Sequence, residues 1–292
     1  MMDAVQYDER AYAHLIEGLS VDTSGHWMQW EWDRTSPWTS YNRARLEEYR
    51  DSVIVAYRFY NRIGLEHIRQ MLAAVPHDAR LLDAGGGTGR KAIPLAQDGF
   101  TDITVLDIAP EWLRLADEKA RKAGVRDRLK LVEGDILNMD DFEDDSFDHV
   151  FAAGGVVSYC GNPQKALCEM ARVLKPGGEL LADGIHGRLG SMRYAARFGN
   201  LEALEELAHP SDVPLRTPAL LPEELEDLAH QAGLTDVRVG AEFIFQPDDE
   251  LRIGPETERW EKIILELEMR YYDDPRFLGT AGLMLRATKG EG

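Results

Sequence analysis

Short hydrophobic runs alternate with amphipathic segments through the middle of the chain. The runs are rich in Leu, Ile, Val and Phe, and most are followed by a segment in which apolar residues recur at helical spacing. Strands are predicted over 80–85, 103–108, 129–132, 147–153 and 179–183, and helices over 88–97, 110–123 and 163–174. Strands that alternate with helices in this way are typical of an α/β fold with a doubly wound, mostly parallel sheet.

The pattern differs on either side of this alternation. Helical spacing runs from 46 to 72, where Gly64 could interrupt the helix, and Pro94 is expected to bend the helix over 88–97. Residues 187–221 hold short helical stretches broken by prolines, and we expect them to form an inserted helical cap. Beyond this cap the pattern predicts a helix over 223–231, a strand over 237–245, a helix over 256–272 and a strand over 279–288.

These shifts in pattern divide the chain into a core with two additions. The core is predicted over 46–186 and 222–289, with 187–221 as the cap and 1–45 as an aromatic-rich N-terminal arm. Four of the six tryptophans lie between positions 27 and 38 of this arm. Such rings bury a large area, so the arm either forms a lid over a binding site or simply docks onto the core.

The overall composition is that of an ordinary globular protein. The chain has 292 residues, of which 44% are hydrophobic and 29% charged, and this length allows one or two domains. We expect no membrane span and no secretory signal, because long apolar runs and a basic leader are missing. The two cysteines, Cys160 and Cys168, do not make a disulfide framework, so a cytoplasmic location is expected. The protein is expected to be a monomer or a homodimer.

The charge of the chain is strongly acidic and unevenly distributed. Lysines and arginines number 33 against 52 acids, which gives a formal net charge of −19. Residues 200–275 hold 20 acids against 6 bases, whereas residues 41–72 hold 6 arginines against 4 acids. The balance argues against nucleic acid as a partner, although the local excess of arginine leaves contact with an RNA open.

A glycine-rich turn follows the first predicted strand, in the sequence Leu81-Leu82-Asp83-Ala84-Gly85-Gly86-Gly87-Thr88-Gly89-Arg90. Glycine permits a positive φ and the close approach of a ligand. The dinucleotide pattern G-x-G-x-x-G, started at Gly85, would need a glycine where Arg90 stands. A carboxylate at Asp83 would also repel a pyrophosphate, so the turn favours a nucleoside that carries a cationic group.

The order acid-x-Gly-x-Gly-x-Gly resembles the first motif of the class I methyltransferases that use S-adenosylmethionine (SAM). The resemblance covers residues 79–183, and Phe147-Asp148 and Arg172–Gly178 are similar to later motifs of the family. It implies a seven-stranded sheet in the order 3-2-1-4-5-7-6 with the last strand antiparallel. It also implies SAM as the cofactor and S-adenosylhomocysteine (SAH) as the product.

Ligands of open α/β sheets bind at the carboxyl ends of the strands. There, Asp83 would attract the ammonium of the cofactor, and Asp107 would accept hydrogen bonds from the two ribose hydroxyls. Asp135 would accept from the adenine amino group. The remaining cofactor contacts are predicted at small and aliphatic residues near the same strand ends: Gly85, Gly87, Ile108, Ile136 and Ala153. Arg58 or Arg62 could reach the carboxylate of the cofactor, or could lie in solvent.

The acceptor side is less well defined, because methyl transfer depends mainly on alignment of the reacting groups. Tyr159, after the fourth strand, and His186, after the fifth, are the candidate catalytic residues. His186 could accept a proton near neutral pH or be an ordinary loop residue, and Tyr159 could bind the acceptor or only pack. No His or Cys cluster has metal-ligand spacing, so no metal is predicted.

The favoured acceptor is an oxygen or nitrogen of a small molecule, with carbon less favoured. Leu265–Tyr271, Pro275 and Gly279, with the glycine-rich turn, also resemble a bacterial subfamily that methylates a carboxymethoxy group on the wobble uridine of transfer RNA. A tRNA-modifying enzyme is therefore one alternative. A SAM-binding protein, or an enzyme that uses SAM without methyl transfer, is the other.

Overall fold

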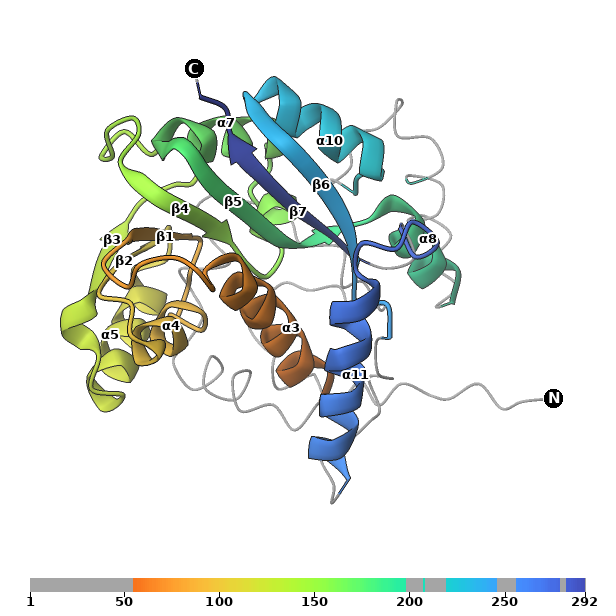
Figure 1. The fold of residues 1–292 in the computed structure, drawn as a ribbon, viewed down its shortest axis with the longest axis horizontal. Helices are drawn as coiled ribbons and strands as arrows, with labels where there is room; N and C mark the ends of the chain where they lie inside the picture. Colours follow the sequence, from red (N-terminus) through yellow and green to blue (C-terminus); the bar gives the residue numbers. More distant parts are fainter. Residues whose placement is uncertain (1–54, 198–206, 208–218, 246–255, 279–281, 292) are drawn as a thin grey trace.

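The computed structural model describes residues 55–197, 207, 219–245, 256–278 and 282–291 (Figure 1). The predicted N-terminal arm over 1–45 and most of the predicted cap over 187–221 lie outside these residues. The division of the chain into arm, core and cap therefore stays a prediction.

The described residues contain a seven-stranded sheet in the order β3-β2-β1-β4-β5-β7-β6. Strands β1 to β5 pair in parallel, whereas β7 is antiparallel to both β5 and β6. The predicted order and the antiparallel last strand are thus confirmed. The strands are β1 Arg80–Ala84, β2 Asp102–Asp107, β3 Leu129–Glu133, β4 Phe147–Ala152, β5 Leu174–His186, β6 Leu234–Glu242 and β7 Gly282–Lys289.

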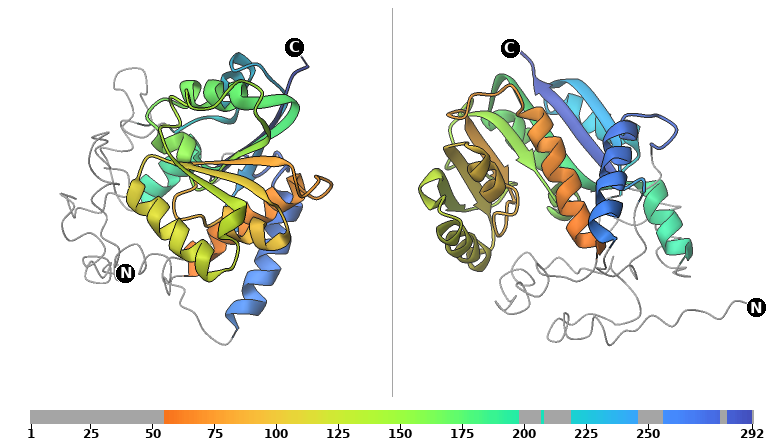
Figure 2. Two further views of the ribbon diagram at one scale, coloured as in Figure 1. Left: turned by 90° about the vertical axis from the view of Figure 1, so that its left-hand side faces the viewer. Right: turned by 60° about the horizontal axis from the view of Figure 1, so that its bottom comes forward.

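Helices cover both faces of the sheet, as the views from two further directions show (Figure 2). Successive strand residues point to opposite faces, so Leu81 packs with the helices of one face and Leu82 with those of the other. Two hydrophobic cores result, one beneath α3, α4 and α5 and one beneath α7 and α10. The helices are α3 Val55–Met71, α4 Ala92–Asp98, α5 Pro110–Lys122, α6 Val156–Tyr159, α7 Pro163–Val173, α8 Arg188–Arg197, α10 Pro222–Gln231 and α11 Thr257–Tyr271.

Some element boundaries differ from the predictions. Residues 88–91 form turns, and α4 begins only at Ala92, so Pro94 lies in its first turn, where a missing N–H breaks no helical bond. The expectation that Pro94 bends a longer helix was wrong. Strand β5 runs from Leu174 to His186 rather than over 179–183, and β6 begins and ends three residues earlier than predicted.

Helix α3 is continuous through Gly64 and lies beside α11 (Figures 1 and 2). Arg62 of α3 donates a hydrogen bond to the buried carboxylate of Glu261 on α11, at 2.5 Å. The side chain of Arg62 is nevertheless 45% exposed, as in the alternative that places it in solvent, and a contact with the carboxylate of the cofactor stays a prediction. The side chain of Arg58, the alternative, lies outside the described side chains.

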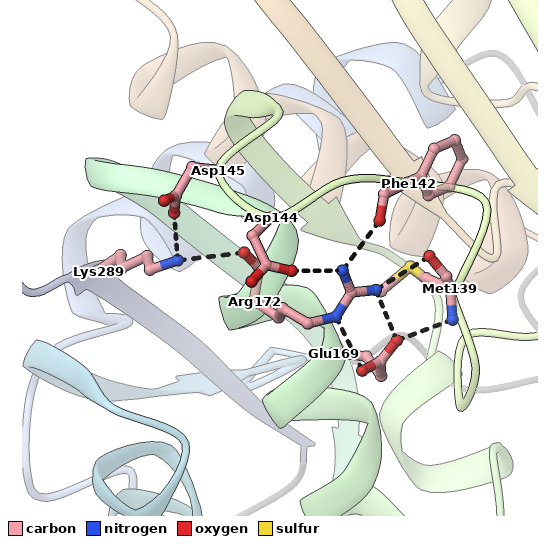
Figure 3. Close-up of polar contacts among 7 residues, drawn as sticks. All are labelled: Met139, Phe142, Asp144, Asp145, Glu169, Arg172 and Lys289. Carbon is pink, nitrogen blue, oxygen red and sulfur yellow. Dashed lines mark hydrogen bonds and ion pairs between the residues drawn. The ribbon is translucent and has the colours of Figure 1, made fainter.

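The crossover from β3 to β4 contains no helix within its residues 134–146, and Arg172 at the end of α7 fastens it (Figure 3). The guanidinium donates to the carbonyl oxygens of Met139 and Phe142, each at 2.9 Å, and also pairs with Glu169 and Asp144. Glu169 in turn accepts from the backbone N–H of Met139 at 2.8 Å. This network lies at the amino ends of the parallel strands, away from the edge where a ligand would bind.

Candidate functional site

The carboxyl ends of β1, β2 and β3 lie side by side, so the predicted cofactor residues share one edge of the sheet. Ala84 of β1 is opposite Leu106 of β2, and Asp107 is opposite Glu133 of β3. The charge of Asp107 is near enough to raise the pKa of Asp83, although less than burial does. Asp135 follows two residues after the end of β3, which extends to Glu133, one residue beyond the predicted end of this strand.

Asp83 is a buried carboxylate that lacks a well-formed hydrogen bond in the described structure. Its side chain is 1% exposed, and neither oxygen accepts a hydrogen bond of good geometry from a described residue, although the backbone N–H of Ala92 is near enough to lower its pKa. It lies beneath the glycine-rich turn, since a Cβ on Gly86 would be 2.6 Å from its Oδ2. Burial raises the pKa of Asp83 to about 7, against the opposing charge of Lys91. A cationic or hydrogen-bond-donating ligand would therefore stabilise this group, which fits the ammonium of SAM.

Asp107 connects the end of β2 to the glycine-rich turn. Its Oδ2 accepts from the backbone N–H of Gly87 at 2.8 Å, and its Oδ1 accepts from that of Ala109 at 2.9 Å. Burial raises its pKa, and these two hydrogen bonds oppose the rise. Each carboxylate oxygen has a second lone pair, so the group can hold the turn and still accept from a ribose hydroxyl.

The glycines of the turn are needed by the protein itself. Gly85 and Gly87 have φ values of +75° and +55°, which other residues adopt only with strain. A Cβ on Gly85 would be 2.7 Å from a methyl of Val156, and one on Gly87 would be 2.6 Å from the ring of Trp112. Packing against side chains of the protein itself is therefore enough to require glycine at these two positions, whether or not a ligand approaches them.

The residues predicted for the adenine ring have different surroundings. Ile108, directly after β2, is a large apolar side chain that is 42% exposed, as expected of a residue that a ligand covers. Ile136 is instead buried in the core on the side of α7 and α10. Asp135 is partly buried, and its Oδ1 accepts from the backbone N–H of Leu137 at 2.9 Å.

On the acceptor side the structure brings the two candidate catalytic residues together. Strand β4 ends at Ala152, and Ala153 opens the turn that leads into α6. The hydroxyl of Tyr159, the last residue of α6, is 3.1 Å from Nε2 of His186, the last residue of β5. The rings meet edge to face with centroids 5.0 Å apart. Burial lowers the pKa of His186 to about 4, so the imidazole is neutral at pH 7.

The predicted cap begins immediately after this pair. A parallel bridge joins Gly187 to Leu220, and the backbone N–H of Leu220 donates to the carbonyl oxygen of His186 at 2.9 Å. Both ends of the 187–221 segment are therefore anchored beside His186.

Sequence reasoning did not single out three charged residues that the structure buries next to this edge: Lys91, Asp183 and Glu242. Asp183 was predicted only as the end of the fifth strand. The signal that could have identified Asp183 is an acid at the predicted end of a buried strand. The same signal identified Asp83, Asp107 and Asp135 at the ends of the first three strands. Lys91 and Glu242 gave no comparable signal, because their burial depends on packing between elements distant in the sequence.

Two further properties of the described residues bear on function. No three or more of their His, Cys, Asp and Glu side chains gather in a way that could hold a metal ion. Among the described helices, none is long and apolar enough to cross a lipid bilayer.

Comparison with known proteins agrees with this geometry. Residues 82–182 match the family described as "Methyltransferase domain". A methyltransferase of Streptomyces halstedii, GfsG, is 29% identical over 162 residues, which cover 53% of this chain and 58% of that protein. A demethylmenaquinone methyltransferase of Renibacterium salmoninarum is 33% identical over 141 residues, which cover 48% of this chain and 55% of that protein. The matched residues thus span about half the length of these two curated relatives, and less of others.

A solved structure from Thermotoga maritima, a SAM-dependent methyltransferase described as a possible histamine N-methyltransferase, shares the fold. The TM-score is 0.53 at 23% identity, over 84% of this chain and 96% of that one. The sheet order and the family match together show that the chain contains a class I methyltransferase domain. SAM is the cofactor of this class of domain. The finer resemblance to the tRNA-modifying subfamily is not confirmed by these comparisons.

Proposed function

We propose that the chain transfers the methyl group of SAM to an oxygen or nitrogen of a small molecule, with carbon less favoured. The observation that carries the proposal is the buried carboxylate of Asp83, whose oxygens accept no hydrogen bond of good geometry from the described residues, beneath a glycine-rich turn that Asp107 holds. A cation is the natural partner of such a group. The contact between Tyr159 and His186 supports an acceptor site at the neighbouring strand ends.

The cofactor, when bound, supplies an electrophilic methyl group and a neutral thioether leaving group. We infer that Asp83 holds its ammonium, Asp107 its ribose hydroxyls and Asp135 its adenine amino group. Ile108 would pack against the adenine ring, with Ile136 beneath. Gly85, Gly87 and Ala153 would contact the methionine portion and the region of the sulfonium. Each of these roles is inferred from the position of the residue at a strand end.

Tyr159 and His186 would position the acceptor rather than remove a proton from it. With a pKa of about 4, His186 is too weak a base to deprotonate a neutral alcohol or phenol efficiently at pH 7. A neutral imidazole can still accept the hydroxyl proton of Tyr159, which leaves the phenol oxygen free to accept from a donor group of the substrate. The favoured acceptors are therefore groups with an available lone pair, such as an amine, or groups that arrive already ionised.

The surface charge supports a small neutral or cationic acceptor over RNA. The net charge of −19 opposes the approach of a phosphate backbone. Of the six arginines in residues 41–72, the two whose side chains are described are held by carboxylates. Arg62 pairs with Glu261, and Arg69 pairs with Asp98 at 2.7 Å.

A radiolabel experiment tests this proposal. The full chain is incubated with SAM labelled on the methyl group and with, in separate reactions, histamine, a catechol, a naphthoquinol and bulk tRNA. The expected result is label in one of the small molecules with SAH as the other product. Label in tRNA alone would select the tRNA alternative, and methylthioadenosine in place of SAH would select an enzyme that uses the carbon chain of SAM. Tyr159→Phe should lower kcat for the small acceptor, while the variant still binds SAH.

A further inference from the structure

A buried group of charges lies behind the site and has no role in the proposal above. It consists of Lys91, Asp183 and Glu242, which are 6%, 2% and 0% exposed. They come from the turn after β1, from β5 and from β6, three elements that are distant in the sequence. Within the described residues, Oδ2 of Asp183 and Oε1 of Glu242 have no hydrogen-bond partner. Burying charged groups costs free energy unless close pairing and hydrogen bonds offset their loss of solvation, so the contacts that these three residues make are informative.

Asp183 holds the turn after β4 by two hydrogen bonds. Its Oδ1 accepts from the backbone N–H of Gly154 at 2.5 Å, and its carbonyl oxygen accepts from that of Gly155 at 3.0 Å. Gly154 itself is exposed. A single residue of β5 therefore binds both glycine amides of the turn that Ala153 opens.

The next residue of β5 is packed against the same turn at backbone distance. Gly184 has a φ of +66°, and a Cβ there would be 2.6 Å from the backbone nitrogen of Gly155. Its own N–H donates to Oε2 of Glu242 at 2.7 Å. Glu242 thus fixes the peptide that follows Asp183, and the close approach of the two backbones leaves no room for a side chain at position 184.

The single positive charge of Lys91 interacts with the two acids of the group, Asp183 and Glu242, beside α3. The Nζ of Lys91 donates to the carbonyl oxygen of Asn61 at 2.8 Å. A Cβ on Gly64 would be 1.9 Å from Oδ2 of Asp183 and 2.7 Å from Nζ of Lys91, so a glycine in α3 makes space for both. Burial raises the pKa of Asp183, whereas Lys91 and the N–H of Gly154 oppose the rise. Burial, followed by the charge of Asp183, raises the pKa of Glu242 well above its usual range.

The turn that Asp183 holds also carries the acceptor-side pair. Gly155 is the residue before α6, and its carbonyl oxygen accepts from the backbone N–H of Tyr159 at 3.0 Å. A Cβ on Gly155 would be 2.9 Å from the ring of Tyr159. His186 lies three residues after Asp183 on β5. A shift of the turn would consequently move both partners of the pair.

We propose that Asp183, supported by Lys91 and Glu242, is a positioning residue for methyl transfer that holds the turn over 153–155 in line with the acceptor-side pair. The proposal rests on the proposed function. An in-line displacement is sensitive to alignment, and a displacement of about 1 Å can cost about a hundredfold in rate. Asp183 touches neither the cofactor nor the acceptor in this account, and it acts through the turn.

Two variants of the full chain test the proposal. Asp183→Ala removes the acceptor of the Gly154 N–H, and Asp183→Asn keeps an oxygen at that position but removes the charge that faces Lys91. Glu169→Ala is the matched control for Asp183→Ala, because Glu169 also accepts a backbone N–H, from Met139 at the opposite edge of the sheet. Hydrogen exchange at 150–160 is measured by mass spectrometry with SAH bound, and kcat is measured with the acceptor that the radiolabel panel identifies.

The variants should differ in the size of their effects on exchange and on kcat. Asp183→Ala should speed exchange at the turn about tenfold and lower kcat about ten- to a hundredfold, with a smaller change in the Kd for SAH, since Ala153 is the one residue of the turn assigned to the cofactor. Asp183→Asn should restore most of the protection and part of kcat. Glu169→Ala should speed exchange near 139 and leave kcat unchanged. If Asp183→Ala does not fold, Asp183→Ser, whose hydroxyl is too short to reach Gly154, replaces it.

Two outcomes would overturn the proposal. One is a folded Asp183→Ala variant whose exchange at 154–155 equals that of the wild type. The other is faster exchange at the turn with kcat unchanged. If the wild-type chain methylates none of the panel, the proposed function fails instead, and the exchange measurement alone decides whether Asp183 holds the turn.

Discussion

The carboxylate of Asp83 should make the ligand-free protein less stable as the pH rises, and Asp83→Asn should remove this effect. The pKa of Asp83 is raised from 3.8 to about 7 by burial. The folded state therefore binds a proton more tightly than the unfolded state does. Below about pH 4, the ionisation of Asp83 does not lower the free energy of unfolding. The loss of unfolding free energy grows through pH 5 and 6 and is complete above about pH 7.

The size of the effect follows from the two pKa values. A difference of about three pH units corresponds to about 4 kcal/mol of unfolding free energy at pH 8 and to between about 1 and 2 kcal/mol at pH 5. The amide of Asp83→Asn still lacks partners, so its absolute stability also contains a constant cost of about 1–3 kcal/mol. The informative quantity is the change with pH in the difference between the variant and the wild type.

Urea unfolding of both proteins without ligand, followed by circular dichroism at pH 5, 6, 7 and 8, measures this quantity. Between pH 5 and pH 8, the unfolding free energy of the variant should rise by about 2–3 kcal/mol relative to that of the wild type. The variant should also bind SAM about ten- to a hundredfold more weakly, since it loses a charge-assisted hydrogen bond of about 1.5–3 kcal/mol. A difference in stability that does not change with pH would refute the reasoning.

Asp148→Asn provides a control of opposite sign. Burial alone would raise the pKa of Asp148, but hydrogen bonds from Lys175 and from the backbone N–H of Arg80 bring it below its usual range. Asp148 therefore stabilises the fold above its unfolded pKa, and this contribution is lost as the pH falls. Asp148→Asn should lower stability at neutral pH and leave SAM binding unchanged.

Three further predictions concern packing, the crossover and the acceptor side. Gly64→Ala should destabilise the fold by about 1–3 kcal/mol in urea unfolding, because the new Cβ meets Asp183; a stability equal to wild type would contradict the packing at this point. Arg172→Lys should lower the unfolding free energy by a similar amount, since it loses the paired hydrogen bonds to the crossover. The Kd for SAH should not change, and a changed Kd would contradict the placement of this network away from the cofactor site. The pH profile of kcat should show no fall from protonation of His186 between about pH 5.5 and 9, because its pKa is about 4; an acidic limb near pH 6.5 that is missing in His186→Gln would contradict this.

The strands and their order were predictable because each carries a strong local signal. The buried runs that end at Asp83 and Asp107 are apolar on both sides, as strands covered on both faces must be. The start of α4 was not predictable from its apolar spacing, because the positive φ values of Gly87 and Gly89 continue the turn as far as residue 91. The extension of β5 to Ile185 and His186 depends on pairing with β7, close to a hundred residues later in the sequence.

The candidate site was predictable where it depends on strand ends and not where it depends on packing between distant elements. The contact of Tyr159 with His186 follows from two residues placed after neighbouring strands. The group of Lys91, Asp183 and Glu242 does not, because no local pattern shows that three charged residues will be buried together behind Gly64.

The central claim is that the carboxylates at the ends of neighbouring strands bind SAM. Calorimetric titration of the full chain with SAH, compared with Asp107→Asn, tests it most directly, because the amide keeps one acceptor oxygen for the glycine-rich turn. The account predicts one site per chain and binding that is about tenfold or more weaker in the variant. No heat with the wild-type chain, or equal affinity in the two proteins, would contradict it.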